Sequence, residues 1–157
     1  MADQLPAVLV EAFASKPLQG NGAAVVLLAE PASEAWMQGV AASLRQSETA
    51  FLSRDDRGQW RLRWFTPTCE VPLCGHATLA ATLALAHWGQ LRRGDKLTLA
   101  SRSGGLEVAL TPDTAADGSN QASLVLPSFA LEPLPVPAGL GDLLGTPVEA
   151  YWGSTLG

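Results

Sequence analysis

The chain has 157 residues, a formal net charge of −5, 47% hydrophobic residues and 16% charged residues. This length is typical of one ordinary domain, and the apolar content is enough for a core, which excludes compositional disorder. The acidic balance argues against a nucleic-acid partner, because phosphate binding needs a basic face.

The first residues and the cysteines indicate the compartment. The stretch MADQLPAVLVEAF has an acidic residue and no basic region before its apolar run, so it does not fit a signal peptide. Cys69 and Cys74 do not make a disulfide framework. We therefore expect the protein to be cytoplasmic, in a reducing environment.

Strands dominate the first half of the chain, with one helix among them. Apolar and β-branched runs predict strands that pair as neighbours at 6–13 and 18–28, the second opening with a Gly-Asn-Gly turn. Ser33 is the predicted N-cap of an amphipathic helix over residues 34–45, with Arg45 in its last turn. Its apolar positions recur at helical spacing, so this helix should lie on a surface.

Two more strands are predicted around a charged turn, at 47–53 and 59–66. The second strand alternates apolar residues (Trp60, Leu62 and Trp64) with arginines (Arg61 and Arg63), so one of its faces should be exposed to solvent.

An apolar helix is predicted from Gly75 or His76 to Gln90. The stretch 71–90 has no formal charge and is about as long as a membrane-spanning helix. Proline, glycine and histidine interrupt it, however, and its apolar residues are mostly alanine, so a buried helix of a soluble protein without a membrane partner is the better interpretation. A helix that is apolar all round needs cover on every side.

The remaining segments predict a hairpin over 96–110 with a Ser-Gly-Gly turn, a strand at 122–128, and a proline-rich connector leading to a short helix near 138–144. The last residues begin like a new strand. The expected fold class is α+β, a curved mixed β-sheet wrapped around a central apolar helix, with one outer helix.

A polar turn, Cys74-Gly75-His76, stands at the start of the apolar helix. A helix start has unpaired backbone N–H groups and a partial positive charge, so this turn is a candidate cradle for a small carboxylate. Gly75 would let the ligand approach the backbone, His76 could add a hydrogen bond, and Cys74 could be a spectator or an acid/base. The alternative is a glycine turn whose histidine is satisfied by neighbouring carbonyls.

Glu48 is the second candidate, at the start of an apolar strand in SETAFL. A carboxylate in partly apolar surroundings has its charged form disfavoured, which suits a general acid/base. The alternative is a strand-edge glutamate that faces water.

Metal and nucleotide sites receive little support. The spacing of Cys69, Cys74, His76 and His87 matches no common zinc pattern, and His87 is better explained as a helix-end residue. The chain has no phosphate-binding loop and no nucleophile elbow, so no metal and no organic cofactor is expected. Cys69 has no assigned role.

Several stretches together resemble the PhzF-like family, named for phenazine biosynthesis. They are VEAFASKPLQGNGAAVVLL, RQSETAFL, RLRWFTPTCEVPLCGHATLAA and SGGLEVAL, and the resemblance covers about residues 7–128. It implies a fold like that of diaminopimelate epimerase, with two similar domains, each a curved sheet around a central helix, and an active site between them. It also implies a cofactor-independent isomerase that moves a proton on a small carboxylic acid.

The resemblance carries roles to particular residues. Glu48 matches the general acid/base of the family, and Gly75 and His76 match substrate-contacting residues. Asn21 lies in the family's Gly-Asn turn, where it is a candidate substrate-binding residue that could line the cleft or simply shape it. Cys74 falls where the epimerases keep a catalytic cysteine. Glutamate is favoured as the base, with Cys74 as a neighbour.

The chain is about half as long as family members. We expect residues 1–128 to form the N-terminal PhzF-like domain and 129–157 a linker and the start of a second, missing or truncated domain, which in the family supplies an acidic partner and a second glycine-rich turn. A homodimer is then expected to complete the cleft. Two alternatives stay open: a cysteine-based epimerase or racemase using Cys74, and a non-catalytic half-domain that dimerises or binds small acids.

Overall fold

The structure is a computed structural model that describes residues 4–115, 118–126, 128 and 131–154. The chain divides into two compact units, Met1–Leu126 and Pro127–Gly157. The described residues contain no helix that is both long enough and apolar enough to span a bilayer.

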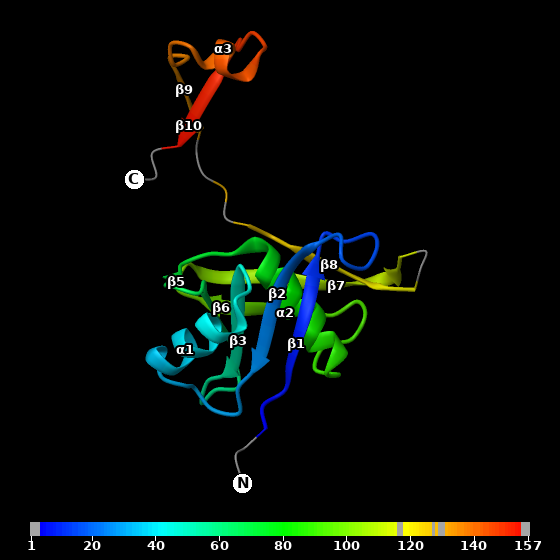
Figure 1. Cartoon of the computed structure of the whole chain (residues 1–157). Helices are drawn as coiled ribbons and strands as arrows, with labels where there is room; N and C mark the ends of the chain where they lie inside the picture. Colours follow the sequence, from blue (N-terminus) through cyan, green and yellow to red (C-terminus); the bar gives the residue numbers. More distant parts are fainter. Residues whose placement is uncertain (1–3, 116–117, 127, 129–130, 155–157) are drawn as a thin grey trace. The chain divides into compact units, whose positions relative to one another are not determined.

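The first unit is one mixed sheet of eight strands with two helices (Figure 1). The strand order is β1-β2-β3-β4-β6-β7-β8, and β5 also pairs with β4. The pairs β2–β3 and β4–β6 are parallel, and the other neighbours are antiparallel. The elements are β1 Ala7–Ala12, β2 Asn21–Leu27, α1 Glu34–Leu44, β3 Glu48–Arg54, β4 Trp60–Phe65, β5 Glu70–Val71, α2 Gly75–His87, β6 Lys96–Ser101, β7 Gly104–Thr114 and β8 Asn120–Leu124.

The sheet curls around α2, as the sequence predicts (Figure 1). This helix packs against β1, β2, β3, β7 and β8, and its Ala77, Ala80, Ala81 and Ala84 are fully buried. Alanines leave little side-chain bulk around the helix, which lets the strands approach it closely. The confirmed fold class is therefore α+β with a curved mixed sheet around a central apolar helix.

The central strands are buried on both faces. Val25 and Ala50 belong to the core around α2, whereas their chain neighbours Val26 and Phe51 belong to a second core under α1. Successive residues of a strand point to opposite faces, so continuous apolar runs are required where both faces are covered. The helix α1 thus lies outside the sheet, and α2 lies inside it.

Several predicted elements are confirmed with small corrections. Ser33 caps α1, accepting a hydrogen bond from the Trp36 backbone N–H at 3.3 Å. Arg45 lies beyond the last turn, in a left-handed conformation with φ 54°. The prediction that α2 extends to Gln90 was wrong, because α2 ends at His87 and Gly89 adopts a positive φ of 70°. In the predicted 96–110 hairpin, the strands close around Arg102 and Ser103, so Gly104 and Gly105 already belong to β7.

The second unit contains a strand that the sequence did not predict. The segment Leu131–Leu134, expected to be a connector, forms β9 and pairs antiparallel with β10, Tyr151–Ser154. Between them lies the short helix α3, Leu140–Leu144, close to its predicted position. In the predicted strand 122–128, β8 ends at Leu124, and residue 127 lies outside the described residues.

Candidate active site

Glu48, Cys74 and His76 come together at the starts of two elements. Glu48 is the first residue of β3, and Cys74 is the N-cap of α2. The helix α2 packs against β3 inside the sheet, and the contact between His76 and Glu48 at 3.1 Å shows that the beginnings of the two elements meet. The fold therefore joins two sequence candidates that are more than twenty residues apart.

His76 is the centre of this cluster. Its Nε2 atom lies 3.1 Å from Glu48 Oε2, and its Nδ1 atom lies 3.4 Å from Cys74 Sγ. The side chains of His76 and Glu48 are 12% and 20% exposed, so both are reachable by a small ligand while most of their surface is covered. This arrangement places a carboxylate, an imidazole and a thiol within reach of one bound molecule.

The Glu48 carboxylate is only partly satisfied. Its Oε2 atom is shielded from solvent, and its contact with His76 Nε2 is close enough for an ion pair but lacks the direction of a hydrogen bond. An oxygen without a full set of hydrogen bonds in a covered position is free to accept a proton or a donor from a ligand.

Cys74 is held as a thiol. Burial is the main cause that raises the pKa of Cys74 above its ordinary value, and the negative charge of Glu48 raises it further. The nearby backbone N–H groups of Ala77 and His76 act in the opposite direction without reversing the shift. Since the thiolate is the nucleophilic and basic form of cysteine, this environment disfavours Cys74 as a base near neutral pH.

The start of α2 is open to a ligand. Cys74 makes no side-chain cap hydrogen bond to the helix. A Cβ atom built on Gly75 would meet no atom within 4 Å, so there is empty space beside the first backbone N–H groups of α2. A helix N-terminus with unpaired N–H groups and free space can bind an anion.

The Gly-Asn-Gly turn lies beside the cluster, where Gly22 contacts Ser47, and the substrate contact of Asn21 stays a prediction. Asn21 is exposed at the start of β2, and its side chain makes no hydrogen bond with the cluster within the part of the chain that the structure describes. The Gly22 carbonyl accepts a hydrogen bond from Ser47 Oγ at 3.2 Å. Ser47 Oγ also lies 3.3 Å from His76 Nε2.

Ser47 was therefore missed by sequence reasoning, although it directly precedes Glu48. The sequence feature that could have indicated Ser47 is its hydroxyl group next to a candidate acid/base at the start of a strand. Its contact with His76 depends on the fold, because 29 positions separate the two residues.

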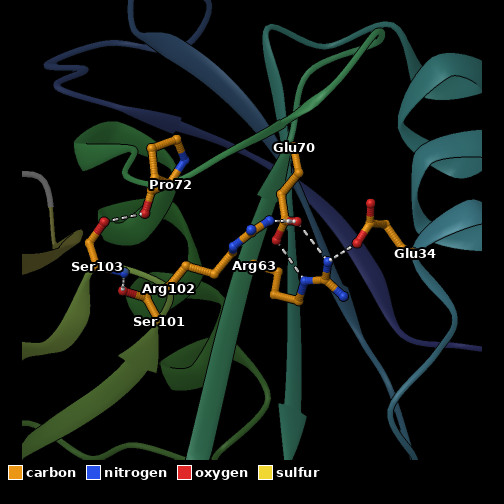
Figure 2. Close-up of polar contacts among 7 residues, drawn as sticks. All are labelled: Glu34, Arg63, Glu70, Pro72, Ser101, Arg102 and Ser103. Carbon is orange, nitrogen blue, oxygen red and sulfur yellow. Dashed lines mark hydrogen bonds and ion pairs between the residues drawn. The ribbon is translucent and has the colours of Figure 1, made fainter. Parts of the chain in front are cut away.

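A second polar cluster, centred on Glu70, was also not predicted (Figure 2). The Glu70 carboxylate is 5% exposed and accepts hydrogen bonds from Arg63 at 2.6 and 2.7 Å and from Arg102 at 2.5 Å. Arg63 also contacts Glu34 of α1 at 2.9 Å. These contacts join β4, β5, α1 and the turn between β6 and β7, and each carboxylate has a cationic partner, which indicates a structural role.

The candidate metal ligands do not converge as a set. Glu48, Cys74 and His76 offer ligand atoms within 4.8 Å of one another, but Glu48 faces one nitrogen of the His76 ring and Cys74 faces the other. Cys69 is exposed and hydrogen-bonded to Thr66, and His87 is the last residue of α2. Neither residue therefore adds a ligand to the group of Glu48, Cys74 and His76.

Comparison with known proteins gives the family. The description "Phenazine biosynthesis-like protein", the PhzC-PhzF family, matches residues 10–135. The chain belongs to this PhzF family. An uncharacterized isomerase of Pseudomonas aeruginosa is 42% identical over 137 residues, which cover 87% of this chain and 49% of that protein. A mouse phenazine biosynthesis-like domain-containing protein is 39% identical over 70% of this chain and 40% of that protein.

Solved PhzF-family structures share the fold. A Clostridium difficile protein described as a putative phenazine biosynthesis PhzC/PhzF protein has a TM-score of 0.75 and 28% identity, covering 96% of this chain and 55% of that one. A predicted epimerase from Pseudomonas aeruginosa has a TM-score of 0.71 and 28% identity, covering 87% of this chain and 47% of that one. This PhzF-family chain thus spans about half the length of the relatives it matches.

Proposed function

We propose that this chain carries one side of the active site of a cofactor-independent isomerase that moves a proton on a small carboxylic acid. Glu48 would be the general acid/base. The observation that carries the proposal is the cluster of Glu48, His76 and the open helix start at Gly75. Two relatives are described as an uncharacterized isomerase and a predicted epimerase, and these descriptions agree with this reaction class.

In this proposal Glu48 takes a proton from a substrate carbon and returns it to another carbon. The C–H bond breaks, its electron pair stays on the substrate and is delocalised there, and a new O–H bond forms on the Glu48 carboxyl. The same proton, or one exchanged with solvent, then leaves Glu48 for the second carbon. The Glu48 side chain is 20% exposed, so a bound acid can reach it for both steps.

The start of α2 would hold the substrate carboxylate. The helix dipole favours an anion at this position, and the space beside Gly75 lets it approach. His76 would donate a hydrogen bond to the same molecule. The substrate is then fixed with a carbon facing Glu48, which lies against the His76 ring.

Glutamate is preferred over cysteine as the base because of their environments. The raised pKa of Cys74 keeps its thiol protonated, whereas Glu48 is adjacent and partly exposed. An epimerase that relies on a Cys74 thiolate is therefore the weaker candidate.

The opposite side of the substrate needs groups from elsewhere. We expect a second copy of the chain, or the remaining length found in its relatives, to face the cluster. Sedimentation or light scattering measures this: a mass of twice 16.4 kDa supports a homodimer, and a monomer contradicts it.

The proposed reaction can be tested in D2O by NMR with small carboxylic acids that carry an acidic C–H bond, such as but-3-enoate and the amino acids. Deuterium uptake into one of these acids is expected, and Glu48→Gln should abolish it. The matched control is Glu34→Gln, a carboxylate on α1 outside the cluster. Undiminished uptake in Glu48→Gln would exclude Glu48 as the base, and acid binding without uptake would favour a binding half-domain.

A further inference from the structure

The hydrogen bonds around Ser47 place a proton on one nitrogen of His76. A serine hydroxyl has a single proton to donate. Ser47 Oγ donates to the Gly22 carbonyl at 3.2 Å, because a carbonyl oxygen can only accept. Ser47 must therefore accept in its other contact, at 3.3 Å from His76 Nε2, and Nε2 must be the donor.

Glu48 gives a second, independent argument for the same proton. Glu48 Oε2 lies 3.1 Å from the same Nε2 atom without the direction of a hydrogen bond, so an ionised Glu48 acts on this nitrogen through its charge. A bare nitrogen lone pair at that distance would repel the carboxylate. Both neighbours of Nε2 therefore favour its protonated form.

The other ring nitrogen has a different neighbour. Nδ1 lies 3.4 Å from Cys74 Sγ, which burial and Glu48 keep as a thiol. A thiol can donate weakly to an unprotonated Nδ1. For the neutral ring, the contacts of both nitrogens thus agree on a proton on Nε2.

We propose that Ser47 is a positioning residue that fixes the His76 ring and its proton on Nε2, so that the ring presents an N–H donor beside Glu48. In the isomerase reaction this N–H would exchange its hydrogen bond with Ser47 for one with a substrate oxygen, and that catalytic consequence rests on the proposed function. The position of the proton does not rest on it, because it follows from the hydrogen bonds of the free chain.

The test is 15N–1H NMR of the intact chain with 15N-labelled histidine. The chain has only two histidines, and His87 is exposed, so its neutral ring serves as an internal reference for a tautomer mixture. At a pH high enough that the 15N chemical shifts of His76 no longer change, we expect its proton on Nε2 alone. This proton should exchange with water more slowly than the ring proton of His87. A proton on Nδ1, or the same mixture as His87, would overturn the proposal.

Variants then test the part played by Ser47. Ser47→Ala should shift the His76 ring toward the His87 mixture and speed exchange of the Nε2 proton about fivefold or more. Ser47→Thr keeps the hydroxyl and should keep both the tautomer and the exchange rate of the native chain. Ser43→Ala removes a serine hydroxyl from the α1 surface and serves as a matched control. If Ser47→Ala does not fold, the isosteric Ser47→Cys replaces it. An unchanged tautomer and exchange rate in these variants would remove Ser47 from the role.

This result is separable from the proposed function. If Glu48→Gln does not affect deuterium uptake but His76 keeps its proton on Nε2, the reaction assignment fails and the tautomer assignment stands. If Glu48→Gln abolishes deuterium uptake but His76 does not keep its proton on Nε2, Glu48 remains the base and Ser47 does not fix the tautomer of His76.

Discussion

The two cysteines of this chain differ in exposure, and this difference predicts their chemistry. Cys69 is exposed, whereas Cys74 is 8% exposed and has a raised pKa. Only the thiolate is reactive, so at about pH 7.5 iodoacetamide should modify Cys69 at least about tenfold faster than Cys74. Mass spectrometry of digested protein measures both rates. The variant Cys69→Ser should show almost no early labelling, and rapid labelling at Cys74 would contradict the raised pKa.

Gly75 allows a test of the anion cradle at a single residue. An added methyl group would meet no protein atom, and Gly75 is not in the left-handed region of backbone conformations. Gly75→Ala should therefore fold normally and gain up to about 1 kcal/mol of helix stability. We expect it to weaken binding of but-3-enoate by about tenfold, which corresponds to about 1.4 kcal/mol.

The measurement for this variant is the shift of the backbone amide signals of residues 75–77 during titration with but-3-enoate. Gly39→Ala is the matched control, because Gly39 also lies in a helix with no atom within 4 Å of the added methyl group. Equal affinity in both variants would show that the ligand does not bind beside Gly75.

At the scale of elements, Glu70 connects β5 to its surroundings through two arginines. Glu70→Gln should lower the free energy of unfolding at pH 7 by about 1–3 kcal/mol, because two charge-assisted hydrogen bonds of a covered carboxylate are lost. Glu34→Gln, which changes an exposed partner of Arg63, should cost less than about 1 kcal/mol. Urea unfolding of both variants measures the difference.

The Glu70 pair also predicts a pH dependence. The hydrogen bond from Arg63 is the main cause that holds the pKa of Glu70 below its ordinary value, and Arg102 adds to it. Because the pKa of Glu70 is lower in the folded state, its ionised carboxylate stabilises the fold. This stabilisation is fully present when the pH is above the ordinary pKa of about 4.5, and it is lost as the pH falls through the folded-state pKa. The gap in stability between the native chain and Glu70→Gln should therefore narrow below about pH 4.5. A gap that stays constant down to about pH 3 would contradict the assignment.

At the scale of the whole molecule, the first unit contains a complete sheet and both described cores. All core residues around α2 and under α1 lie before residue 126, and the β9–β10 pair makes a separate two-stranded sheet. An isolated two-stranded sheet adds little stability of its own. A chain that ends at Leu126 should therefore unfold cooperatively, within about 1 kcal/mol of the 157-residue chain.

Urea unfolding followed by tryptophan fluorescence measures this, since Trp60 and Trp64 lie in the first unit. Circular dichroism provides an independent signal for the same transition. A truncated chain that fails to fold would show that the first unit is not stable on its own.

Local patterns were sufficient for most of the fold. The alternation of tryptophan and arginine predicted one buried face of β4, and the alanine-rich run without charge predicted the central helix that the sheet encloses. Ser33 marked the start of α1. Each of these features depends on residues close together in the chain, so periodicity and capping chemistry are enough to predict it.

The sequence by itself determined the α+β class, the enclosed helix and the candidates Glu48 and His76. Only the tertiary structure decided that these two side chains meet, that Ser47 contacts the His76 ring, and that Gly22 contacts Ser47. It also decided the pairing of Glu70 with Arg63 and Arg102, and the pairing of β9 with β10. The physical reason is that these contacts join separate segments of the chain, and their distances follow from how those segments fold together.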